Sequence, residues 1–118
     1  MIVLDKKYVF HIPLYKFENN DFVLIDINNI LDDLINQLNQ NGYDSFYIMN
    51  GKGYYKSRAF DELLITVFIS QEQLKIKNQE FPDSIFKNWF KRNNNILKQE
   101  AFAYEYENNM FIWELNEN

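Results

Sequence analysis

The sequence of 118 residues lacks cysteine and has only one histidine. It also has only three glycines and two prolines, the residues that most often interrupt helices and strands. Without cysteine there is no disulfide framework, no cysteine-ligated zinc site and no thiol nucleophile. Scattered carboxylates leave only an oxygen-ligand metal site, and Asp32-Asp33 lacks the spacing of a calcium loop. We therefore predict no metal and no cofactor.

The chain also lacks any stretch near the roughly 20 apolar residues that a membrane helix needs. Its N-terminal apolar run, Ile2 to Leu4, is short and precedes its charges, the reverse of a secretory signal. We therefore expect a cytoplasmic protein without membrane contact. The length predicts a single domain over residues 1–118, with an interior filled mainly by large side chains because 18% of the residues are aromatic.

Alternating apolar residues predict several strands. Residues 7–15 form one, which lies at an edge or ends at Pro13 because proline cannot donate to a strand ladder. A short strand over 45–49 is followed by a predicted turn at Asn50-Gly51-Lys52-Gly53. Residues 62–70 are β-branched, aromatic and almost uncharged, which predicts a central strand covered on both faces.

Two segments have the periodicity of amphipathic helices. Residues 26–41 place apolar side chains at helical spacing, with Asp26 as a plausible N-cap and Gly42 just after the last turn. A second helix begins near Pro82, which suits a first helical turn. Its predicted apolar stripe consists of Ile85, Phe86, Trp89, Phe90 and Leu97.

The C-terminal segment predicts a β-hairpin. An Asn108-Asn109 loop suits a type I′ turn, since asparagine tolerates the positive φ of both central positions. This loop places Tyr104 opposite Trp113 on an apolar face. The other face carries Glu105, Glu107 and Glu114.

The predicted order is β-α-β-β-α-β with an additional strand from the terminal hairpin. This order favours an α+β, ferredoxin-like split β-α-β layout, in which two helices pack on one face of a mainly antiparallel sheet.

Charge is distributed unevenly around a net value of −5. Residues 26–41 are acidic and residues 82–98 are basic, so we expect Asp32 or Asp33 to pair with Lys87, Lys91 or Arg92 across the helix seam. The acidic hairpin face contains no basic residue of its own. A surface of this kind suits a basic protein partner, and the predicted contacts are Glu105, Glu107, Glu114, Asp32 and Asp33.

The segment from Asn50 to Arg58 is the one candidate anion site. Its glycines allow close backbone approach, and its side chains supply positive charge and aromatic rings. The sole histidine would need a partner such as Asp61 or Glu62 to act as a base. The candidate anion or ligand residues are Lys52, Tyr55, Lys56, Arg58 and His11.

No motif in the chain identifies a reaction or a ligand, and two functions remain possible. The first is a small acidic, non-catalytic binding protein, such as an inhibitor or an immunity- or antitoxin-like cap for a basic protein. The alternative is a small-molecule-binding protein or enzyme, also compatible with a homodimer, with an aromatic pocket of roughly 300 Å³ or more on the open sheet face. Its test residues are His11, Tyr47, Tyr55 and Arg58. We favour the first function, which involves no catalysis, and the net charge disfavours nucleic acid.

Overall fold

The computed structural model describes residues 1–55, 57–76 and 80–115, and for Tyr55 the backbone alone. Its elements in chain order are β1 (Lys6–Pro13), β2 (Tyr15–Glu18), β3 (Asp21–Leu24), α1 (Asn28–Gln40), β4 (Phe46–Tyr55), β5 (Arg58–Ile69), the 3₁₀ turn η1 (Gln73–Lys75), α2 (Pro82–Leu97), β6 (Ala101–Tyr106) and β7 (Asn109–Glu114).

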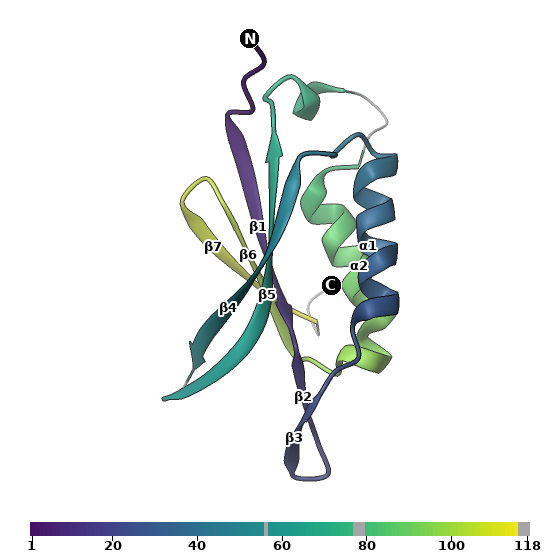
Figure 1. Ribbon diagram of the computed structural model, residues 1–118, viewed down its shortest axis with the longest axis vertical. Coiled ribbons are helices and arrows are strands. Elements are labelled where there is room, and N and C mark those ends of the chain that lie inside the picture. The colour runs from purple at the N-terminus through teal and green to yellow at the C-terminus, as the bar shows by residue number, and fades with distance from the viewer. Residues whose placement is uncertain (56, 77–79, 116–118) are drawn as a thin grey trace.

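The main sheet has five antiparallel strands in the order β4-β5-β1-β6-β7. Both helices lie on one side of it (Figure 1). The crossovers through α1 and α2 place β1, β4, β5 and β6 in the split β-α-β arrangement, and β7 adds an edge strand beside β6. The predicted α+β, ferredoxin-like layout is therefore confirmed.

The core lies between the helices and the sheet face that they cover. Strand residues Phe10, Ile12 and Ile65 are fully buried there, as are Leu34 of α1 and Phe86 of α2. The indole Nε1 of Trp89 donates a hydrogen bond of 2.6 Å to the carbonyl of Ile30, so the helices are joined by a polar contact as well as by apolar packing. Both predicted apolar stripes are confirmed.

The two ends of α1 differ from each other in how well the sequence predicted them. Asp26 is not the N-cap, because Ile27 occupies that position and no side chain caps it. At the other end Gly42 has a φ of 83°, and the amide of Tyr43 donates to the carbonyl of Leu38 at 2.9 Å. Glycine can adopt this conformation without strain, and the bond satisfies one of the last helix carbonyls.

The predicted turn at residues 50–53 is wrong, because β4 runs through it without a break. Gly51 pairs with Glu62 and Gly53 with Phe60 in the ladder with β5. A Cβ on Gly51 would lie 3.1 Å from the Leu64 side chain, and one on Gly53 would lie 3.3 Å from the Glu62 carboxylate. These glycines therefore make room for side chains of the next strand and do not bend the chain.

The C-terminal hairpin forms with a different register from the predicted one. Its turn residues are Glu107 and Asn108, with φ values of 52° and 65°, so Tyr104 pairs with Phe111 and Trp113 pairs with Phe102. The turn lies one residue earlier in the chain than predicted, which shifts the pairing between the two strands by two residues. The two-faced character of the hairpin is kept, because a shift of two leaves each side chain on its own face.

A second hairpin, β2–β3, was missed by the sequence analysis. Asn19 and Asn20 form its two-residue turn with φ values of 54° and 64°. The side chain of Gln99 donates to the carbonyl of Tyr15 at 2.9 Å, and Lys98 lies 2.9 Å from Glu18. These contacts hold the hairpin against the C-terminal end of α2.

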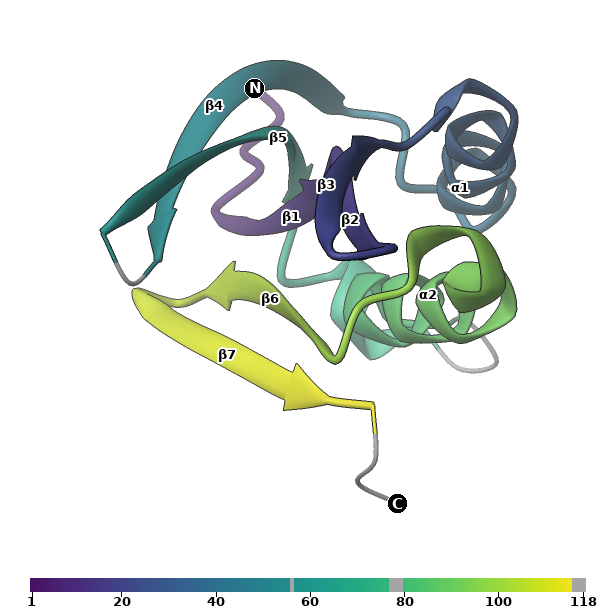
Figure 2. The ribbon, with the colours of Figure 1, turned by 90° about the horizontal axis from the view of Figure 1, so that it is seen from below.

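Two strand predictions are corrected in part. β1 is an inner strand and not an edge strand, and it ends at Pro13, which is the second of the two positions predicted for this proline. β5 is also an inner strand, but the helices cover only one of its faces (Figures 1 and 2). In the described part of the chain, no helix has the length and apolarity to cross a membrane.

Candidate functional site

The sheet face opposite the helices carries a group of three ionisable side chains, Glu62, His11 and Glu105, here called the open-face trio. They come from the adjacent strands β5, β1 and β6. His11 Nδ1 lies 3.1 Å from Glu62 Oε1, and His11 Nε2 lies 2.6 Å from Glu105 Oε2. The exposed fractions of these side chains are 18% for His11, 21% for Glu62 and 44% for Glu105.

The hydrogen-bonding capacity of the three side chains limits how both contacts can be satisfied. An ionised carboxylate only accepts hydrogen bonds, and a neutral imidazole has one N–H. Both contacts are hydrogen bonds when His11 carries two protons, or when one carboxyl group keeps its own proton. The trio is therefore a linked hydrogen-bonding group on an accessible face of the sheet.

Apolar side chains surround the trio. Leu64 and Ala103 lie directly beside His11 in the strand register, and Met49 and Ile112 continue the row to the two sheet edges. Met49 is 51% exposed and Ile112 is 69% exposed. The open face thus combines charged groups with exposed apolar side chains, and it lies next to Gly51 and Gly53 of β4, which have no side chains.

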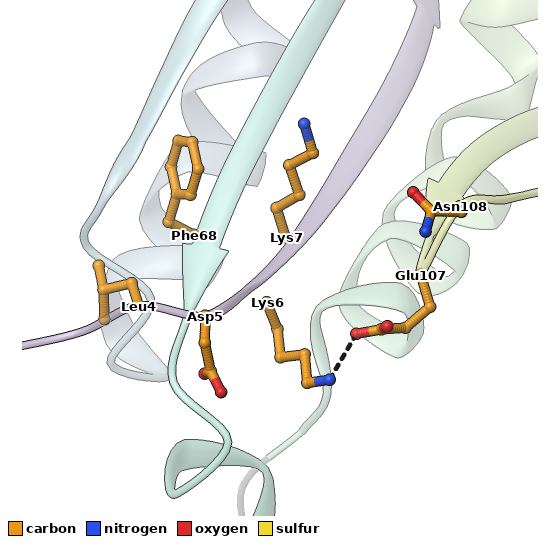
Figure 3. A pocket seen from close by; sticks show the side chains of 7 residues that line it. All are labelled: Leu4, Asp5, Lys6, Lys7, Phe68, Glu107 and Asn108. Carbon is orange, nitrogen blue, oxygen red and sulfur yellow. Dashed lines mark ion pairs between the residues drawn. The ribbon is translucent and has the colours of Figure 1, made fainter.

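Two hollows flank this face. The first, of about 270 Å³, lies where the N-terminal segment meets the β6–β7 turn. Figure 3 shows Lys6 in it reaching toward Glu107. The Lys6 ammonium lies 2.8 Å from a carboxylate oxygen of Glu107. Glu107 raises the pKa of the Lys6 ammonium by this hydrogen bond and by its charge. The second, of about 340 Å³, lies between the β2–β3 hairpin and the outer end of β4–β5, and its lining includes Lys52, Arg58 and Asp61.

Comparison with solved structures gives a match along nearly the whole chain. A phage SAM lyase in its apo state superposes with a TM-score of 0.52 at 12% identity, covering 96% of this chain and 91% of the lyase. A phage SAM lyase in complex with S-methyl-5'-thioadenosine superposes with a TM-score of 0.52 at 14% identity, covering 92% and 88%. The fold resembles that of phage SAM lyase. Neither a protein-family model nor a curated protein sequence matches the chain.

These matches correct two expectations from the sequence. A non-catalytic inhibitor or cap for a basic protein is contradicted, because the proteins that share the whole fold are named as enzymes that act on a small molecule. The leaning against catalysis is contradicted for the same reason. The alternative, a small-molecule-binding protein or enzyme, is better supported by these matches.

The predicted acidic contacts do not form one free patch. Glu105 belongs to the trio, Glu107 lies in a turn and pairs with Lys6, and Glu114 is exposed on β7. Sequence reasoning found no basic residue near this hairpin because the partners of Glu107 and Glu105, Lys6 and His11, both come from β1. On the helix side, Asp33 pairs with Arg92 at 2.9 Å, which confirms the predicted seam contact, while Asp32 is exposed.

The predicted anion residues are distributed over two places. His11 lies in the trio, whereas Lys52 and Arg58 line the 340 Å³ hollow. Tyr55 pairs with Arg58 at the end of the β4–β5 ladder, and Lys56 lies outside the described residues. Of the two carboxylates predicted as possible partners for His11, Glu62 contacts it at 3.1 Å, whereas Asp61 pairs with Lys52.

Proposed function

We propose that this chain binds S-adenosylmethionine on the open face of its sheet and cleaves the bond between its sulfur and its amino acid chain. The observation that carries the proposal is the match over nearly the whole chain to phage SAM lyase, in one case in complex with S-methyl-5'-thioadenosine. That nucleoside thioether is what remains of S-adenosylmethionine when the amino acid chain leaves its sulfur.

The charge and apolarity of the open face suit such a substrate. A sulfonium carries a positive charge among apolar methyl and methylene groups, and the face supplies partly exposed carboxylates, Glu62 and Glu105, beside Met49 and Leu64. Partial exclusion of water strengthens the attraction between a carboxylate and a cation. Cleavage converts the sulfonium to a neutral thioether, so this attraction favours the substrate over the product.

The trio also supplies a proton acceptor. In an elimination, a base removes a proton from the carbon next to the one bonded to sulfur, a carbon–carbon double bond forms, and the carbon–sulfur electron pair leaves with the thioether. We assign the base to Glu62, whose carboxylate contacts His11 at 3.1 Å and lies over the side-chain-free position of Gly53. His11 orients this carboxylate, and Glu105 orients His11 from the other side.

The test is to incubate the purified protein with S-adenosylmethionine and to follow the products by liquid chromatography and mass spectrometry. We expect S-methyl-5'-thioadenosine, with a co-product that is one water lighter than homoserine because no water is consumed. Glu62→Gln should lower the rate by roughly 100-fold or more, as loss of a general base does. Glu114→Gln, on β7 of the same sheet, is the matched control and should keep the wild-type rate.

Calorimetric titration separates binding from cleavage. Glu62→Gln should weaken binding of S-adenosylmethionine more than binding of S-methyl-5'-thioadenosine, since only the former carries the sulfonium charge. Failure of the wild-type protein to bind either compound at millimolar concentration, together with no product, would refute the proposed function. Equal losses in Glu62→Gln and Glu114→Gln would move the site away from the trio.

A further inference from the structure

We propose that the 340 Å³ hollow between the β2–β3 hairpin and the outer end of β4–β5 is a second binding site, for a carboxylate or phosphate carried on an aromatic ring. Figure 1 shows the β2–β3 hairpin projecting below the helices, with the joined ends of β4 and β5 on the same lower side of the molecule. The hollow is lined by Tyr15, Phe22, Lys52, Arg58, Ala59, Phe60 and Asp61. None of these residues belongs to the open-face trio.

Arg58 is the anion-binding group of this hollow. Its guanidinium carbon lies 5.1 Å from the centroid of the Phe22 ring. Among the described residues, no carboxylate lies within ion-pair distance of Arg58. A guanidinium stacked on a ring keeps the N–H groups at its edge available, and their fork geometry matches a carboxylate or a phosphate.

The net charge of the lining supports an anionic ligand. Lys52 is the other cation, and its ammonium lies 3.3 Å from a carboxylate oxygen of Asp61. These two charges offset each other, so Arg58 leaves the hollow with one uncompensated positive charge. An anionic group on the ligand supplies the missing counter-charge.

The aromatic wall indicates what carries the anion. Between centroids, the Phe22 ring lies 5.1 Å from the Phe60 ring, and both residues line the hollow; the Phe17 ring, outside the lining, lies 5.2 Å from Phe22. Aromatic rings favour further rings in offset or edge-to-face contact at such distances. The volume lies within the range of small-molecule pockets, about 300 to 1,000 Å³.

The walls of the hollow are held in place by contacts outside it. Gln99 donates to the carbonyl of Tyr15 at 2.9 Å, and Lys98 pairs with Glu18 at 2.9 Å, so the β2–β3 hairpin is fixed to the end of α2. The opposite wall belongs to the continuous β4–β5 ladder. A site whose walls are already ordered loses little conformational entropy when a ligand binds.

The experiment uses the full chain and four probes: phenyl phosphate, phenylacetate, inorganic phosphate and benzyl alcohol. Binding is measured by calorimetry and located by ¹H–¹⁵N NMR. We expect saturable binding of at least one aromatic anion, with shifts at the amides of Phe22 and residues 58–61. The relative affinities of phenyl phosphate and phenylacetate show which anion the site prefers. Arg58→Gln should weaken binding about tenfold or more.

Two further variants make the test specific. Arg92→Gln removes an exposed arginine on α2 and should leave probe binding unchanged. Glu62→Gln, which tests the proposed function, should also leave it unchanged, so the two proposals can fail independently. The second site is rejected if neither aromatic anion binds saturably, if benzyl alcohol or inorganic phosphate binds as tightly, or if Arg92→Gln weakens binding as much as Arg58→Gln does.

Discussion

The two faces of the five-stranded sheet are built from alternate residues of the same strands, and they have opposite roles. On the helix-covered face, Phe10 and Ile65 have no exposed surface. One position along, on the open face, His11 and Leu64 are only partly buried. The covered face stabilises the fold, which leaves the open face free to keep charged groups and exposed apolar side chains that contribute little to stability and are available to a ligand.

The largest expected effect tests this division directly. Ile65→Ala removes a fully buried side chain of β5 and should lower the free energy of unfolding by about 2–5 kcal/mol, since it leaves a cavity under the helices. Met49→Ala removes a side chain of similar size from the open face and should lower it by less than about 1 kcal/mol. Denaturant titration measures both. Equal losses would mean that the open face is a second core.

A smaller effect concerns a polar group under the helices. Tyr43 is fully buried and its hydroxyl donates to the carbonyl of Glu80 at 2.7 Å. Tyr43→Phe should lower the free energy of unfolding by about 1 kcal/mol at neutral pH, because the carbonyl loses its hydrogen-bond donor.

The same residue predicts how stability changes in alkali. Burial, and then the charge of Asp83, raise the pKa of Tyr43 from 10 to about 12. Folding therefore favours the protonated phenol, and this contribution is present below pH 10 and lost as the pH rises from 10 to 12. Burial and Asp83 raise the pKa of Tyr8 as well, with the same sign. Thermal melts should show this loss in the wild type and a smaller one in Tyr43→Phe; identical alkaline profiles would contradict the assignment.

On the open face, the trio should show coupling with only a modest energy. His11→Gln leaves Glu62 and Glu105 facing each other without the imidazole between them and should lower the free energy of unfolding by about 1 kcal/mol, because solvent screens partly exposed charges. The double variant His11→Gln with Glu62→Gln should lose less than the sum of the single losses. Strict additivity in denaturant titrations would show that the three side chains do not act together.

The smallest effect is expected at the outer surface of the helices. Arg92 and Asp33 form an exposed pair at 2.9 Å, and such pairs contribute about 0.2–1 kcal/mol. Arg92→Gln should change stability within this range and should change it less in 1 M salt, where exposed charges are screened. An effect that persists undiminished in high salt would indicate a contribution other than charge.

Sequence reasoning predicted which face each side chain occupies better than it predicted which residues meet. Alternation along the strand predicted over residues 7–15 is enough to place His11 on the side opposite Tyr8 and Phe10. Contact with Glu62 and Glu105, 51 and 94 positions away, depends on β1 lying between β5 and β6, and only the packed helices and their crossovers determine that order.

Turn residues gave the least reliable predictions because each has more than one structural use. The glycines at 51 and 53 leave space for Leu64 and Glu62 in a continuous strand. An Asn-Asn type I′ turn does occur, but at Asn19-Asn20. In the C-terminal hairpin the turn includes Glu107, where the ion pair with Lys6 offsets part of the cost of a positive φ.

The Glu107-Asn108 turn has an evolutionary consequence. Moving the turn by one residue along the chain changes the strand pairing by two, so a homologue with the Asn108-Asn109 turn would keep Glu105 on the open face and Tyr104 under the helices. Paired insertions or deletions at the tip therefore lengthen or shorten this hairpin without reversing its faces. A single residue inserted within either strand reverses them beyond that point, unless a bulge absorbs it. Length variation among relatives of this chain should accordingly occur at this tip and not within either strand.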